Sequence, residues 1–178
     1  AMSASNHIYD SFSSATNWSI NNSPYFKIDN GEFKISTDAS NPVVYANNLD
    51  FNGATNNRIF EFNFRDNGTD IDTGGSYGVM VGFYNSSTIF FRSIIQPKQG
   101  QIGVGYQLGG SYRVIPLIYI PGYVKGASYK ATFKHVNSSS INLYINDVLL
   151  TTYSLDINVP NVIYKPYVTA NQYFKMNI

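Results

Sequence analysis

Short segments in which apolar and polar side chains alternate strictly constrain the fold of this chain more than any other feature. In the segment 58–65 of the 178-residue sequence, phenylalanines at positions 60, 62 and 64 alternate with polar residues. The segments 129–136 and 141–146 alternate in the same way. Because successive side chains of a strand point to opposite faces, each segment predicts a strand with one buried and one solvated face. No segment shows the apolar period of a helix.

Turn residues separate the predicted strands. Asn30-Gly31, Gly109-Gly110 and Asn146-Asp147 each lie between two such segments and predict hairpins, whose turns favour residues that adopt positive φ. Pro116 predicts an edge strand or a loop, because proline lacks the amide that a central ladder uses. The predicted strands recur about every 8 to 12 residues, which is typical of sandwiches and barrels.

These patterns predict an all-β protein that folds as one antiparallel β-sandwich. A chain of 178 residues is long enough for one sizeable core, whereas two sandwiches would each be small. We expect this domain to span residues 7–178. Residues 1–6 are expected to be a flexible start or a remnant of a cloning junction.

The composition limits the classes of partner. Charged residues make up 13% of the chain, about half the usual share, and the net charge is +1. We therefore expect no nucleic-acid partner, and the lack of a long apolar run predicts no membrane insertion. The chain has no cysteine, which excludes disulfides and cysteine-bound zinc. Many neutral hydrogen-bonding side chains and aromatic rings favour a neutral polar ligand, with binding that salt hardly affects.

Several segments resemble the laminin-G-like and concanavalin A-like jelly-roll superfamily. They are residues 9–12, 17–19, 26–35, 78–84, 89–92, 129–133 and 141–150. The opening pairs Asp10 with aromatic neighbours and leads to Trp18, and the late hairpin differs from the family pattern because Val148 follows Asp147 where glycine is usual. The resemblance implies a jelly-roll sandwich with Trp18 in its core. It implies no single function, because the superfamily includes lectins, carbohydrate-binding modules, glycosidases and adhesion domains.

The Asn- and Tyr-rich, cysteine-free composition also resembles carbohydrate-binding domains of phage tail and baseplate proteins. The two resemblances together imply a lectin-like domain that attaches its parent protein or virion to a cell-surface polysaccharide. Its partners would be a polysaccharide or cell-surface glycan and, in addition, other subunits of a surface or tail assembly. The expected location is extracellular, at a cell surface or on a virion.

Glycines occupy one face of two predicted strands, 77–84 and 101–108, and bulky residues occupy the other. If the strands are close in the sheet, the glycines leave a bare floor that faces solvent, and a sugar can lie there against aromatic rings while Gln and Arg bond its hydroxyls. The residues predicted to line this groove are Tyr84, Arg92, Gln101, Gln107, Tyr112 and Arg113. The alternative interpretation is that the glycines permit tight sheet twist and the tyrosines pack at the sheet rims.

The segment 66–72 places three carboxylates, Asp66, Asp70 and Asp72, in one predicted loop. Calcium takes six to eight oxygen ligands, and loops of this kind supply them. The spacing is not that of the helix–loop–helix calcium motif. We expect a solvated acidic loop and no cofactor, and a calcium site formed by these three residues is the alternative.

A glycosidase of this fold needs two carboxylates about 5 to 10 Å apart, usually two or four residues apart on one strand face, and neither Glu61 nor Glu32 has a second carboxylate in that register. Glu61 and Glu32 alternate with neutral or basic residues along their predicted strands. His135 falls on an apolar face and is expected to be a hydrogen-bonded core residue. We therefore predict that the domain is not an enzyme. The main alternative to carbohydrate binding is a structural or protein-adhesion module, and a glycoside hydrolase is the least favoured.

Overall fold

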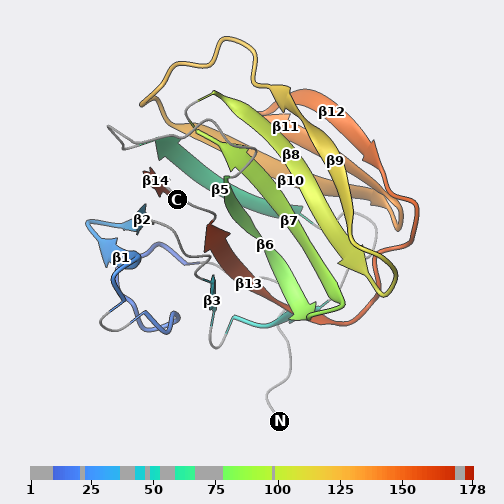
Figure 1. Ribbon diagram of the computed structural model, residues 1–178, viewed down its shortest axis with the longest axis horizontal. Coiled ribbons are helices and arrows are strands. Elements are labelled where there is room, and N and C mark those ends of the chain that lie inside the picture. The colour runs from blue at the N-terminus through green and yellow to red at the C-terminus, as the bar shows by residue number, and fades with distance from the viewer. Residues whose placement is uncertain are drawn as a thin grey trace.

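Two antiparallel sheets form the fold, as the alternation predicts (Figure 1). The computed structural model describes residues 10–20, 23–36, 43–46, 49–52, 59–66, 78–97, 99–170 and 175–178, with the backbone alone described at 51–52 and 175–177. Every strand pair in this part of the chain is antiparallel. Among the same residues, no helix has the length and apolar character that crossing a membrane requires.

The first sheet contains, in spatial order, β1 (Phe26–Asp29), β2 (Glu32–Ser36), β14 (Lys175–Asn177), β5 (Ile59–Asp66), β10 (Tyr129–Asn137), β11 (Ser140–Ile145) and β12 (Val148–Ser154). The second sheet contains β3 (Val43–Tyr45), β13 (Ile163–Ala170), β6 (Val79–Ser86), β7 (Ile89–Gln96), β8 (Gln101–Leu108) and β9 (Arg113–Tyr119), and β4 (Phe51–Asn52) pairs with β13. Pairings such as β13 with β6 and β14 with β5 join segments that are distant in the sequence.

The three predicted hairpin turns are confirmed. Asn30 and Gly31 join β1 to β2 with φ of 52° and 72°, and Asn146 and Asp147 join β11 to β12 with φ of 51° and 67°. Two successive residues with positive φ give the turn a twist that matches the twist of the strands. Gly109, with φ of 89°, lies in the turn between β8 and β9. Pro116 lies on β9, which is an edge strand as predicted.

The core lies between the inner faces of the two sheets. In β5, Phe62 and Phe64 are buried while Glu61 and Asn63 are exposed, so the predicted alternation holds there. The first sheet also supplies Phe33, Phe133 and Leu143 to the core, and the second sheet supplies Val81, Phe91 and Val104. These apolar side chains leave water together, which is the main force that holds the two sheets face to face.

Trp18 is buried in the core, as the resemblance implies. Its ring lies edge-on to Phe33 at 4.9 Å between centroids. Asp10 accepts a hydrogen bond from the indole Nε1 at 2.6 Å with one oxygen and from the amide of Phe12 at 2.8 Å with the other. A buried indole N–H needs such a partner, so Asp10 connects the start of the described chain to the core.

Replacing Asp10 by Ala is expected to lower the free energy of unfolding by about 1 to 2 kcal/mol, because the buried indole N–H loses a charge-assisted hydrogen bond. Denaturant unfolding followed by fluorescence of Trp18, the only tryptophan, measures this loss. Asp10→Asn is the control and should lose less, because the amide oxygen still accepts one bond. An Asp10→Ala variant as stable as the parent would contradict the role given to this contact.

Candidate functional site

The glycine face does not form an open floor, which corrects the expectation from the sequence. β6 and β8 are not neighbours, because β7 lies between them and pairs Arg92 with Gly82 on one side and Gly105 on the other. The glycines of both strands do lie on the face that points away from the core, but they are buried. The bare trough that the two glycine-dotted strands predicted is therefore absent.

Atoms of neighbouring strands fill the space above the glycines. A Cβ on Gly82 would lie 2.5 Å from the Cα of Arg92 and closer still to the carbonyl oxygen of Phe91. A Cβ on Gly103 would lie 3.1 Å from the Cα of Leu117, and one on Gly105 would overlap the hydroxyl of Tyr112. The glycines thus allow close packing within the sheet, in agreement with the alternative interpretation.

Five aromatic side chains lie together with Arg92 on this outward face of the second sheet. They are Tyr45 of β3, Tyr84 of β6, Phe90 of β7, Tyr112 before β9 and Tyr167 of β13. The strand register explains the grouping, because Tyr45 pairs with Tyr167, Tyr167 with Gly82, and Gly82 with Arg92. We call these six residues the aromatic–arginine cluster.

The rings of the cluster contact one another in a continuous chain. Tyr45 lies 4.5 Å from Tyr84 between centroids, and Tyr84 lies 5.4 Å from Tyr167. Phe90 connects Tyr167, at 6.4 Å, to Tyr112, at 5.9 Å. Such tilted and edge-on geometries are favourable for aromatic pairs. The cluster is therefore a packed surface in which each ring is held by its neighbours.

Arg92 places a positive charge against two of these rings. Its guanidinium carbon lies 5.2 Å from the centroid of Phe90 and 5.3 Å from that of Tyr112, and its Nη2 donates a hydrogen bond to the Tyr112 hydroxyl at 2.9 Å. Cation–π contact with both rings supports the charge where water is partly excluded. The residues on either side across the sheet are Gly82 and Gly105, so no neighbouring Cβ competes for the space.

Nε of Arg92 is buried without a hydrogen-bond partner among the described residues, and the buried hydroxyl of Tyr167 lies at the Arg92 guanidinium without donating to a described acceptor. Burial raises the pKa of the Tyr167 hydroxyl, and the positive charge of Arg92 and its hydrogen-bond contact with that hydroxyl oppose the shift. Burial also raises the pKa of Tyr45, and the adjacent Tyr84 hydroxyl adds to the effect. Tyr45 and Tyr167 are therefore neutral donors at ordinary pH.

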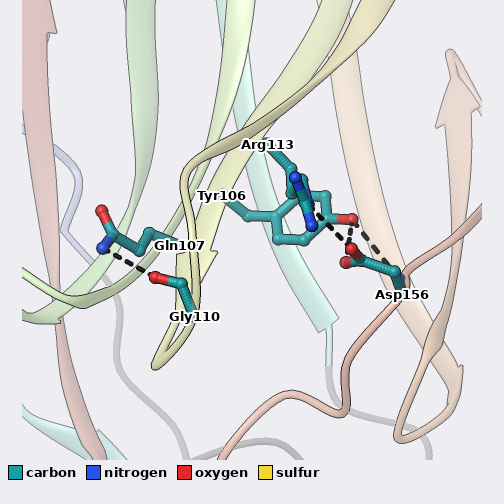
Figure 2. A network of polar contacts seen from close by, with 5 residues as sticks. All are labelled: Tyr106, Gln107, Gly110, Arg113 and Asp156. Carbon is teal, nitrogen blue, oxygen red and sulfur yellow. Dashed lines mark hydrogen bonds and ion pairs between the residues drawn. The ribbon is translucent and has the colours of Figure 1, made fainter.

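Three of the six residues predicted from the sequence, Tyr84, Arg92 and Tyr112, belong to the cluster. Gln107 lies beside it, because Gln107 pairs with Phe90 across the sheet. Its Nε2 donates a hydrogen bond to the carbonyl oxygen of Gly110 at 2.9 Å, which stabilises the β8–β9 turn (Figure 2).

Arg113 and Gln101 do not join the cluster. Arg113 belongs to the opposite face, where its Nε lies 2.8 Å from a carboxylate oxygen of Asp156, and Tyr106 donates to the other oxygen at 2.7 Å (Figure 2). The Tyr106 hydroxyl and the Arg113 guanidinium hold the pKa of Asp156 below its ordinary value. Gln101 begins β8, six residues before Gln107 and so about 20 Å from it along the strand.

The predicted calcium ligands are only partly described. Asp66 ends β5, where its carboxylate is buried and lies 3.6 Å from Nζ of Lys125. Asp70 and Asp72 lie outside the described residues. Within the described ranges, no group of three His, Cys, Asp or Glu side chains has the arrangement of a metal site. The calcium site stays a prediction.

The other candidate catalytic groups are in the first sheet or the core. Glu61 accepts a hydrogen bond from Thr132 at 2.7 Å, and Glu32 lies 2.9 Å from the guanidinium of Arg65. His135 is buried as predicted, and its Nε2 has no hydrogen-bond partner among the described residues, so the expected hydrogen bond is not made by that atom. Burial lowers the pKa of His135 to about 4.

Tyr45, Phe90 and Tyr167 were not among the residues predicted from the sequence. The sequence did contain evidence that Phe90 lies beside Arg92. The two residues are two positions apart on one strand, so their side chains share a face. No local signal pointed to Tyr45 or Tyr167. These residues join the cluster only through the pairing of β3 and β6 with β13.

No protein-family model and no curated protein matches the sequence. The fold is similar to that of several solved structures. The carbohydrate binding module CBM66 from Bacillus subtilis has a TM-score of 0.59 at 11% identity, covering 89% of this chain and 96% of that chain. A structure described as a native glycosidic hydrolase has a TM-score of 0.65 at 10% identity, covering 99% of this chain and 94% of that chain. Porphyranase B from Zobellia galactanivorans has a TM-score of 0.61 at 8% identity, covering 94% of this chain and 87% of that chain.

These likenesses establish the fold class. The chain is an antiparallel β-sandwich of the concanavalin A-like jelly-roll type, as the sequence predicts. The structural relatives include both a binding module and hydrolases, and their identities of 8 to 11% carry no function to this chain. Any function has to be argued from the aromatic–arginine cluster itself.

Proposed function

We propose that this protein is a non-catalytic carbohydrate-binding domain whose binding face is the outward face of the second sheet. The observation that carries the proposal is the aromatic–arginine cluster. Ring faces stack on the C–H faces of sugars, and phenol and guanidinium groups hydrogen-bond sugar hydroxyls at positions that the packing has already fixed. Because the rings hold one another, binding orders few side chains and costs little conformational entropy.

Tyr112 offers the most accessible ring of the cluster. It lies in the turn between β8 and β9, is 39% exposed and packs over Gly105. The similar fold of a carbohydrate binding module is compatible with this role. In the described strands, the outward face of the second sheet carries no carboxylate, which favours binding over hydrolysis, since glycoside hydrolysis uses two.

Replacing Tyr112 by Ala is expected to weaken glycan binding about tenfold or more while changing the free energy of unfolding by less than about 1 kcal/mol, because the ring is partly exposed and lies in a turn. Glycan-array screening followed by calorimetric titration measures the affinity. Tyr119→Ala is the control, because Tyr119 is 70% exposed at the far end of β9 and outside the cluster. A folded protein that binds no glycan at all would refute the proposed function.

One observation favours a structural or protein-adhesion module as the second candidate. Val114, Ile118 and Tyr119 expose apolar surface along the edge strand β9. Apolar side chains on an edge strand are typical of contacts with another protein. Sizing chromatography separates the two candidates, because stable self-association without glycan binding favours this one. Attachment to a cell surface, a virion or a tail assembly stays a prediction from the sequence.

A further inference from the structure

The charges on the outward face of the second sheet are all positive in the described strands. Arg92 belongs to the cluster, and Lys165 of β13 pairs across the sheet with Tyr84 of the cluster. No described carboxylate forms an ion pair with either residue, although five ion pairs occur elsewhere in the described chain. The face therefore has a positive potential that no described neighbour neutralises.

The position of Arg92 makes its lack of an anionic partner costly. Its Nε–H is buried without a hydrogen bond, and the adjacent Tyr167 hydroxyl, on a residue only 3% exposed, also lacks an acceptor among the described residues. Buried donors are nearly always satisfied in native proteins, and an unsatisfied donor on a charged group is the most unfavourable case. The buried Nε–H of Arg92 is therefore a donor whose acceptor a ligand can supply.

We propose that the ligand is an acidic saccharide, and that its carboxylate binds Arg92 while its sugar ring stacks on the cluster. This inference rests on the proposed function and names the substrate class. A guanidinium and a carboxylate are both planar and form two parallel hydrogen bonds, so this pair is stronger and more directional than a bond to a neutral hydroxyl. The inference revises the neutral ligand and the salt-insensitive binding that the overall composition predicts.

Tyr112 explains how a carboxylate reaches the arginine. Its hydroxyl accepts the bond from Nη2 of Arg92 and lies directly above Gly105. Because the residue is in a turn and 39% exposed, we expect its hydroxyl to shift off the guanidinium while the ring keeps its contact with Phe90. The carboxylate then takes the place of a neutral phenol oxygen as acceptor, which is a stronger bond for the guanidinium.

The test uses the free acids of glucuronate, galacturonate and mannuronate, with their methyl esters as neutral counterparts. The Nε–Hε cross-peak of Arg92 in a nitrogen-15 spectrum, assigned by its loss in Arg92→Lys, reports contact with the guanidinium. At least one acid should shift this peak, its methyl ester should bind about tenfold or more weakly, and affinity should fall as salt rises. Sodium acetate should bind more weakly than the acid, because it has no sugar ring to stack.

Variants separate binding from folding. Arg92→Met should lower affinity for the acid about 10- to 100-fold and leave the melting temperature unchanged or higher, because an unpaired, half-buried charge is removed. Arg92→Lys should lose less, since it retains the charge without the planar fork. Arg113→Met is the control and should leave affinity unchanged, because Arg113 pairs with Asp156 outside the cluster.

The failures of the two proposals are distinguishable. If neutral glycans bind in a manner sensitive to Tyr112→Ala while no uronate shifts the Arg92 peak, the acidic ligand is wrong and the carbohydrate-binding function stands. Equal affinity for an acid and its methyl ester would likewise overturn the acidic ligand alone. If neither neutral nor acidic saccharides bind the folded protein, both proposals are wrong.

Discussion

Replacing Gly82 by Ala should lower the free energy of unfolding by about 3 kcal/mol, at the upper end of the usual cost of overpacking. A Cβ at this position would lie 2.5 Å from the Cα and 2.8 Å from the Cβ of Arg92, and it would overlap the carbonyl oxygen of Phe91. These are mainly backbone atoms of the adjacent strand, which cannot rotate away as a side chain can. β6 and β7 would have to separate, and hydrogen bonds in the middle of the second sheet would weaken.

Denaturant unfolding of the Gly82→Ala variant measures this effect, and Gly110→Ala is the matched control. Gly110 has no atom within 4 Å of the equivalent Cβ position, and its φ is not left-handed. Alanine there should leave the stability unchanged or raise it by up to about 1 kcal/mol, because it restricts the unfolded chain. Equal stability of the two variants would show that the sheet accommodates a Cβ at position 82, and the predicted clash would be wrong.

Acidification should also destabilise the protein well above the pH at which most carboxylates titrate, because of His135. Burial lowers the pKa of His135 from 6.5 to about 4. Between these values the unfolded chain binds a proton that the folded protein does not, so stability is complete above about pH 6.5 and is lost as pH falls toward 4. The difference corresponds to about 3 kcal/mol.

Urea unfolding at a series of pH values measures this loss. The series runs from 7 down to about 4, the pKa of His135 in the folded protein. His135→Leu removes the titrating group and should flatten the curve over this range, and His135→Gln does the same while it retains a polar side chain. The wild-type minus variant difference isolates the histidine from the carboxylates, whose protonation adds to the loss at lower pH. A decline that persists unchanged in both variants would assign it to other groups.

Much of the fold was predictable because it depends on local patterns. The alternation around Phe62 identifies β5 and its inner face, and Asn30-Gly31 and Asn146-Asp147 identify two hairpins through their need for positive φ. These signals depend only on residues near one another in the chain. Trp18 was also placed correctly, from the resemblance of its surroundings to a jelly-roll family.

The candidate site was predictable only in part. Alternation places Arg92 and Phe90 on one face, yet Tyr112 and Arg113 are adjacent residues and the structure directs them to opposite sides. The sequence also shows that, in each of the segments 77–84 and 101–108, the glycines lie on one side of the strand. It does not show that β7 lies between the two strands or that Tyr112 occupies the space above Gly105.

The sequence alone therefore determined the strands in which side chains alternate, such as β5, β10 and β11, with their buried faces and the main turns, since the strand period and the turn dihedrals are properties of neighbouring residues. Only the tertiary structure decided the surroundings of Arg92. Tyr45 and Tyr167 join its cluster through strands that pair across long sequence distances, and nothing near either residue encodes that pairing. A binding face assembled from several strands depends on strand order, which follows from the burial of the whole core rather than from any single segment.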